Sequence, residues 1–281
     1  MADKVTLPEL ETLEGTMRQS PIHLLAGCLL ALCLATASLT AFQADQPGAL
    51  PDLPNKPEPQ SSVFNGCPPE GTGGDRTLNR LKNREDVADR WYPVSFSAIA
   101  ELPWPRSVDK RSRSRWSSAS RREVAEHEGT PVSVECYIAK IRAQKDEACN
   151  CHSTDPAMRD FHVWLTNEPS EDRSGSIVAE VTPRLRAKHP KWSANAFNRL
   201  AQKHTYVRIS GWLLLDQEHP EEVGRSRGTL WEIHPIMEVE TEAPGGRRRS
   251  LDTWLAEPDL AENWLTTSRG WQRVAMLRIW Q

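Results

Sequence analysis

The chain has 281 residues, of which 38% are hydrophobic, 26% are charged and 21 are proline. This composition is lean for a globular protein of this length, so it argues against one large close-packed domain and predicts a single compact core with long flanking segments. The formal net charge of −3 gives no basis for predicting a nucleic-acid partner from the overall charge.

An uncharged apolar run near the N-terminus begins at Ile22 and ends at Phe42, and it is long enough to cross a membrane. Arg18 precedes this run, which favours a cytoplasmic tail at residues 1–20 and a main domain outside the cytoplasm. Residues 21–42 are therefore predicted to be a transmembrane anchor. If Ala35-Thr36-Ala37 is a signal-peptidase site, they are instead a signal peptide, and the main domain is secreted.

Two segments with little hydrophobic periodicity follow. Residues 43–74 are rich in Pro, Gly and polar residues and predict an extended linker. Residues 75–129 predict a helical and basic linker region, in which Asp75 caps a short helix with Leu78 and Leu81 on one face. The run from 106 to 122 is strongly basic, so it either contacts phosphate groups or forms a solvated linker beside anionic lipid or cell wall.

Residues 130–242 carry the strongest strand signals and predict the compact domain. Val132, Val134, Cys136 and Ile138 alternate with other residues, as in a strand with one buried face. A helix is expected at 193–203, and five strands are expected at 131–141, 160–166, 176–181, 206–215 and 228–240. This β-β-β-α-β-β order is that of the five-stranded Greek-key barrel called the OB-fold, with a small α+β sheet as the alternative.

The C-terminal tail at residues 243–281 is rich in tryptophan. Trp254 and Trp264, with their neighbouring leucines, give a partial helical stripe. The tail either packs on the barrel, lies on a membrane surface or is a poorly ordered extension.

Polar residues on the predicted strands are the candidates for catalysis. Asp160 and His162 share one strand face, Glu180 lies on the next strand, and Glu232 and His234 share a face of the last. If both faces line one groove, His162, Glu180 and His234 would converge on one water or metal ion, as metal-assisted phosphodiester hydrolysis requires. The alternative is that these residues are hydrogen-bonded structural groups.

A second interpretation is a binding module without turnover, and it is the leading prediction. Trp164, Trp212 and Trp231 would be stacking platforms for single-stranded nucleic acid or an oligosaccharide. Arg184, Arg208 and Glu232 would supply the charged contacts around them. A third possibility is an envelope interaction protein, in which the barrel only scaffolds a partner.

The cysteines outside the apolar run are Cys67, Cys136, Cys149 and Cys151. Thiols outside the cytoplasm are normally oxidised, so we expect Cys149 or Cys151 to pair with Cys136 or Cys67. The competing hypothesis is a site for zinc or another divalent metal formed by Cys149, Cys151 and His152, with His162 or His234 completing a tetrahedral set. A third alternative is that Cys149 and Cys151 are free thiols.

Seven stretches of the chain resemble a family of uncharacterised, exported bacterial OB-fold proteins: NGCPPEGTGGD, LNRLKNR, ACNCH, DFHVWL, EVTPR, VRISGWLLLD and GTLWEIHP. The resemblance covers about residues 65–239. It implies a secreted or membrane-tethered OB-fold domain with no established reaction, and it leaves the tryptophan-rich tail outside.

Overall fold

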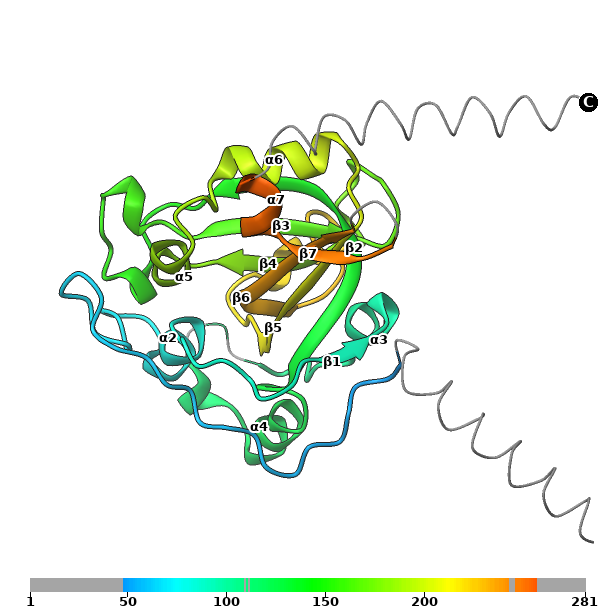
Figure 1. The fold of residues 1–281 in the computed structure, drawn as a ribbon. Coiled ribbons are helices and arrows are strands. Elements are labelled where there is room, and N and C mark those ends of the chain that lie inside the picture. The colour runs from blue at the N-terminus through cyan, green and yellow to red at the C-terminus, as the bar shows by residue number, and fades with distance from the viewer. Residues whose placement is uncertain (1–47, 109, 111, 243–245, 257–281) are drawn as a thin grey trace, which may run out of the picture. The chain divides into compact units, whose positions relative to one another are not determined.

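A closed five-stranded mixed barrel forms the centre of the structure, a computed structural model that describes residues 48–108, 110, 112–242 and 246–256 (Figure 1). The barrel strands are β2 (Pro131–Ala143), β3 (Phe161–Thr166), β4 (Ile177–Val181), β5 (Val207–Leu215) and β6 (Trp231–Glu242). They are hydrogen-bonded in the order β2-β3-β4-β6-β5, and β5 pairs back onto β2 to close the barrel. Only the β4–β6 pair in the barrel is parallel, so the described strands confirm a mainly-β fold and are consistent with an OB-fold-like barrel.

The barrel strands form because their apolar residues alternate toward a common interior. Val134 of β2, Val163 of β3 and Val181 of β4 are buried in one hydrophobic cluster. Gly211 lies where β5 bends, since the β5–β6 register shifts on both sides of it. A Cβ at this position would lie 2.3 Å from the Pro235 carbonyl oxygen, so the close approach of β5 to β6 requires glycine here.

Short helices and two short strands surround the barrel. The helix α6 (Ala194–Gln202) follows β4 and precedes β5 along the chain, as the sequence predicts. Strand β1 (Tyr92–Val94) pairs with β2, and β7 (Arg248–Ser250) pairs with β6. The other α-helices are α2 (Arg76–Lys82), α3 (Phe96–Ala100), α4 (Ser118–Ala125), α5 (Pro183–Lys188) and α7 (Leu251–Ala256). The 3₁₀ turns are η1 (Arg113–Arg115), η2 (Ala148–Asn150), η3 (Pro156–Met158) and η4 (Pro220–Glu222).

The segments before residue 130 pack on the barrel, contrary to their prediction as linkers. Figure 1 draws the chain from residue 48 running past α4 and α2 on the side away from α6. Lys56 donates hydrogen bonds to two backbone carbonyls at the end of α4. Val94, Ile99 and Val124 belong to the same hydrophobic cluster as the barrel strands. The predicted boundary at residue 130 is therefore wrong, because the two sides share one core.

Two terminal predictions fall largely outside the described residues. The apolar run that begins at Ile22 and most of the tryptophan-rich tail are not among the residues that the structure describes. Within the described part of the tail, Trp254 of α7 is buried in the barrel core cluster. None of the helices that the structure describes is long and apolar enough to cross a membrane.

Candidate metal centre

The polar residues of β3, β4 and β6 lie on the outer face of the barrel. In β4, Ile177, Ala179 and Val181 belong to the core cluster, so the alternating residue Glu180 points to the opposite face. The same alternation places His162 of β3 outward. In β6 it places Glu232 and His234 outward, because Trp231 and Ile233 are in the core.

Strand register brings the three predicted catalytic residues together. His162 pairs directly with Glu180 across β3 and β4, and its Nε2 lies 2.5 Å from Glu180 Oε1. Ala179 pairs with Ile233 in the parallel β4–β6 ladder, so the next residues, Glu180 and His234, are neighbours. The second Glu180 oxygen, Oε2, lies 3.6 Å from His234 Nδ1. The three side chains thus lie in one cluster, but His162 and His234 belong to different sets of ligand atoms that lie within 4.8 Å of one another, and Glu180 is common to both sets.

The turn around η2 closes over this outer face and adds three more polar groups. Asp160 immediately precedes β3, and its Oδ2 accepts a hydrogen bond from Asn150 Nδ2 at 3.0 Å. Cys149 Sγ lies 3.6 Å from the same Asp160 oxygen and 3.4 Å from Glu147 Oε2. Because this turn covers the strands, the cluster is buried although it lies outside the barrel interior.

Two cations flank the cluster. Arg227 Nη1 lies 2.6 Å from Glu232 Oε1 and 3.3 Å from Asp216 Oδ2. Lys82 of α2 pairs with Glu218 at 3.1 Å and lies 4.0 Å from Glu147. Carboxyl groups nevertheless outnumber these two cations within the cluster, whose acids are Glu147, Asp160, Glu180, Asp216 and Glu232. Such an excess of buried carboxylate must be protonated or neutralised by a bound cation.

Several buried polar atoms in the cluster have no hydrogen-bond partner among the described residues. They are Asp160 Oδ1, Glu180 Oε2, Glu232 Oε2 and both ring nitrogens of His234. Buried polar groups are nearly always paired, and each unpaired one costs about 1–3 kcal/mol. Asp160, Glu180 and His234 also offer ligand atoms that lie within 4.8 Å of one another. Three of the groups that have an atom without a partner, Asp160, Glu180 and His234, are therefore spaced to share one ion.

Burial shifts the pKa values of these groups away from their charged forms. It lowers the pKa of both His162 and His234 to about 4. It raises the pKa of Glu180 to about 8 and that of Glu232 to about 7. Both imidazoles are thus neutral near pH 7, which is the form that binds metal ions, whereas Glu180 retains a proton that a cation would displace.

A cavity of about 340 Å³ leads from the surface to this cluster. Glu147, Cys149 and Lys82 line it, together with His152 and His219. The Glu147 side chain is 21% exposed, so it connects the buried cluster to the cavity. The arrangement gives water or a small ligand a route to the cluster.

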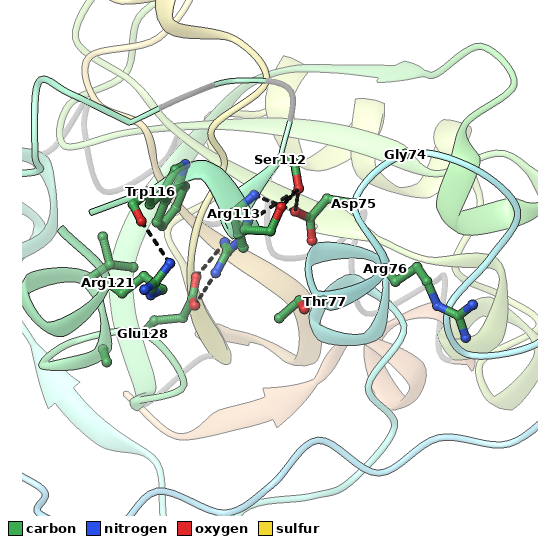
Figure 2. A pocket seen from close by; sticks show the side chains of 12 residues that line it. Gly74, Asp75, Arg76, Thr77, Ser112, Arg113, Trp116, Arg121 and Glu128 are labelled. Carbon is green, nitrogen blue, oxygen red and sulfur yellow. Dashed lines mark hydrogen bonds and ion pairs between the residues drawn. The ribbon is translucent and has the colours of Figure 1, made fainter. Parts of the chain in front are cut away.

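A larger cavity of about 640 Å³ lies between the beginning of α2 and α4 (Figure 2). Its charged groups bind one another. Arg113 Nη2 donates to Glu128 Oε1 at 2.8 Å, and Asp75 Oδ2 accepts from the Arg113 backbone and Ser112. In Figure 2 Arg76 points away from these paired groups. None of the buried side-chain atoms that lack a partner in the described chain belongs to this cavity, so it is a weaker candidate.

The predicted stacking platforms are not accessible. Trp164 and Trp212 are each 1% exposed and Trp231 is 0% exposed. Trp212 is covered by the Arg84 guanidinium, which lies 3.4 Å from its ring centroid. The prediction of a tryptophan-lined binding face is therefore wrong, because these indoles pack inside the protein.

The charged residues predicted to surround those platforms have protein partners instead. Arg184 is buried and donates to Asn83 Oδ1 and to the Cys67 carbonyl. Arg208 pairs with Glu240 at 2.6 Å, and Glu232 pairs with Arg227. Arg184 therefore holds the chain around Cys67 and Asn83 against the barrel. The prediction that these three side chains contact a ligand is not supported by their positions.

The cysteine metal site proposed from the sequence does not form. Cys151 is joined to Cys67 in a disulfide, which confirms one of the predicted pairings and removes the Cys151 sulfur as a thiolate ligand. Cys149 is a free, buried cysteine. Its Sγ lies beside Asp160 and Glu147, and it lines the cavity together with His152. The roles of Glu147, Lys82 and Arg227 were missed, because no local pattern relates these residues to the three strands.

Comparison of the chain with protein-family models, with curated proteins and with solved structures found no match. The case for function therefore depends on the geometry of the cluster.

Proposed function

We propose that this protein is a metal-dependent hydrolase built on an OB-fold-like barrel, with a divalent metal ion held by Asp160, Glu180 and His234. The observation that carries the proposal is that each of these three residues has a buried polar atom without a hydrogen-bond partner among the described residues, and that their ligand atoms lie within 4.8 Å of one another. A bound ion would pair these atoms and neutralise the excess carboxylate.

The ligand chemistry limits which ions fit. One imidazole nitrogen and two carboxylate oxygens suit Zn²⁺, Mn²⁺ or Fe²⁺ better than a soft ion that prefers sulfur. Three protein ligands leave coordination positions open for water, as is typical of catalytic rather than structural sites. A water bound to such an ion loses a proton near neutral pH and becomes a nucleophile.

The cavity supports an anionic substrate. Lys82 lines it with its side chain only 5% exposed and pairs there with Glu218, and a phosphate group that took the place of Glu218 would bind this ammonium beside the metal ion. In the proposed reaction, an ion held by Asp160, Glu180 and His234 would activate a water for attack on phosphorus; as the bond from phosphorus to the leaving oxygen breaks, that oxygen would take up a proton and leave as an alcohol. Glu147, at the border of the cavity and the cluster, is placed to hold a proton of the attacking water.

The test is metal content and phosphodiesterase activity of the purified full chain. We expect bound divalent metal by elemental analysis and hydrolysis of bis(p-nitrophenyl) phosphate that a chelator abolishes. Asp160→Asn and His234→Gln should lose both. His189→Gln is the matched control, because His189 pairs with Asp252 outside the cluster. Equal metal content in all four proteins, or none in the wild type, would overturn the metal centre. Bound metal without hydrolysis of any phosphate ester would overturn the reaction alone.

We also propose that the domain works outside the cytoplasm, tethered or released according to the fate of residues 22–42. The Cys67–Cys151 disulfide supports this location, since such bonds persist in oxidising compartments. A C-terminal alkaline phosphatase fusion tests it, because that reporter is active only after export. An inactive fusion of normal abundance would refute it.

A further inference from the structure

Glu180 presents its two carboxylate oxygens to two different histidines. Oε1 lies 2.5 Å from His162 Nε2, and Oε2 lies 3.6 Å from His234 Nδ1. The two imidazoles come from β3 and β6, on either side of β4. A carboxylate held between two nitrogen ligands in this way has the geometry of a bridge between two ions.

A second set of ligand atoms lies on the His162 side of this carboxylate. Glu147, His162 and Glu180 offer atoms within 4.8 Å of one another. This set shares only Glu180 with the first set of Asp160, Glu180 and His234. Each histidine therefore has its own acidic partner, Glu147 for His162 and Asp160 for His234, and Glu180 is common to both.

A direct hydrogen bond between His162 and Glu180 is the competing explanation for their short contact. It would satisfy Oε1, but it leaves the buried Oε2 without a partner and leaves the surplus of carboxyl groups unchanged. Two ligands of one ion at bond lengths of about 2.1 Å lie about 3.0–3.4 Å apart, in octahedral or tetrahedral geometry. His162 Nε2 and Glu180 Oε1, which are 2.5 Å apart, would therefore need to separate by about 0.5–1 Å to admit an ion.

The two sets differ in their access to solvent. Asp160, Glu180 and His234 are all buried, whereas Glu147 is partly exposed and lines the cavity beside Lys82. An ion on the Glu147 side would thus be the one that exchanges with solvent and meets the substrate.

We propose that the centre holds two divalent ions bridged by Glu180, one bound by Asp160 and His234 and the other by Glu147 and His162. This inference rests on the proposed function, and it deepens it. Two ions about 3.5–4 Å apart stabilise both the attacking and the leaving oxygen in phosphate-ester hydrolysis. The substrate is therefore a phosphate ester whose phosphate group enters from the cavity and binds the ion held by Glu147 and His162.

Metal stoichiometry and Mn²⁺ electron paramagnetic resonance of the full chain test the proposal. We expect about two Mn²⁺ ions per wild-type chain and a spectrum broadened by coupling between them. Glu147→Gln should reduce the content to about one ion and give the six-line spectrum of an isolated Mn²⁺. Glu147 is partly exposed, so this variant retains the buried packing. Glu218→Gln is the matched control, because Glu218 lines the same cavity but belongs to neither ligand set.

Each outcome separates the two proposals. Two coupled ions that become one in Glu147→Gln, but not in Glu218→Gln, support the bridged pair. One ion in the wild type and in Glu147→Gln refutes the second ion and leaves the single-metal function intact. Two ions without coupling refute the Glu180 bridge. No bound ion in the wild type refutes both the second site and the proposed function.

Discussion

The protonation of the buried cluster predicts how the stability of the metal-stripped protein depends on pH. Glu180 and Glu232 have folded pKa values of about 8 and about 7, both raised from 4.5 by burial. Above pH 4.5 the unfolded chain therefore releases protons that the folded protein retains, and stability falls as pH rises until each folded pKa is passed. His162 and His234 act in the opposite sense between about 4 and 6.5, because their folded pKa values are lowered.

The magnitude follows from a slope of about 1.4 kcal/mol per pH unit for each group. Between pH 4.5 and 6.5 two rising and two falling contributions cancel. From pH 6.5 to 7 both glutamates lower the free energy of unfolding, and from pH 7 to 8 Glu180 continues alone. The loss between pH 6.5 and 8 is then about 3 kcal/mol. Burial also raises the pKa of Asp160, which steepens the decline.

The assay is urea denaturation of chelator-treated protein at closely spaced pH values from 5 to 8, repeated with saturating Zn²⁺ or Mn²⁺. A bound ion keeps Glu180 and Asp160 ionised in the folded state, so most of the decline above pH 6.5 should disappear and stability should rise with metal concentration. Glu180→Gln should retain less than half of the decline. If the metal-stripped protein is equally stable or more stable at pH 8 than at pH 6.5, Glu180 is ionised in the folded state and the reasoning fails.

Three further predictions concern residues 48–129 and their disulfide to the end of the η2 turn. In each case the change in the free energy of unfolding is measured by urea denaturation. Replacing Cys67 and Cys151 with serine should cost about 4.5 kcal/mol from chain entropy, because the bond closes a loop of 84 residues; an unchanged midpoint would show that the bond is not formed. Arg84→Ala should cost about 3 kcal/mol, since the buried guanidinium stacks on Trp212, and Arg84→Lys should recover only part of it. Asp75→Ala should cost about 1–2 kcal/mol through loss of the α2 cap, whereas an equal loss in Asp75→Asn would contradict capping.

The barrel strands were predictable because the pattern that identifies each strand lies within the strand itself. Alternation over five or more residues identifies each strand, and a single strong amphipathic stretch identifies α6. The start of α2 was predictable for the same reason, since Asp75 caps it by accepting from the Leu78 backbone. The helix α5 was not predicted, although local residues mark its start. With Thr182 as its cap, Pro183 begins this helix.

The packing of residues 48–129 was not predictable from composition. Few apolar residues, many prolines and a basic run are typical of linkers, but this segment is fixed by contacts distant in sequence. Arg184 donates to the Cys67 carbonyl, and Asn83 Nδ2 donates to the Cys149 carbonyl at 2.7 Å. Both bonds need partners more than 60 residues away, and no local pattern records them.

Burial of the outer face of β3 also explains why one strand pattern suggested two opposite functions. Alternation places Trp164 and His162 on the outer face of β3, and an outer face is expected to meet solvent and ligands. In the folded chain Arg142 and Arg173 lie over the Trp164 ring, and Glu147 beside the η2 turn lies next to His162, so the indole is packed and the imidazole is part of a buried polar layer. Burial removes the stacking role because a ring must be reachable to stack. It strengthens the metal role, because neutral imidazole and crowded carboxylates are the groups whose cost of burial a divalent ion offsets.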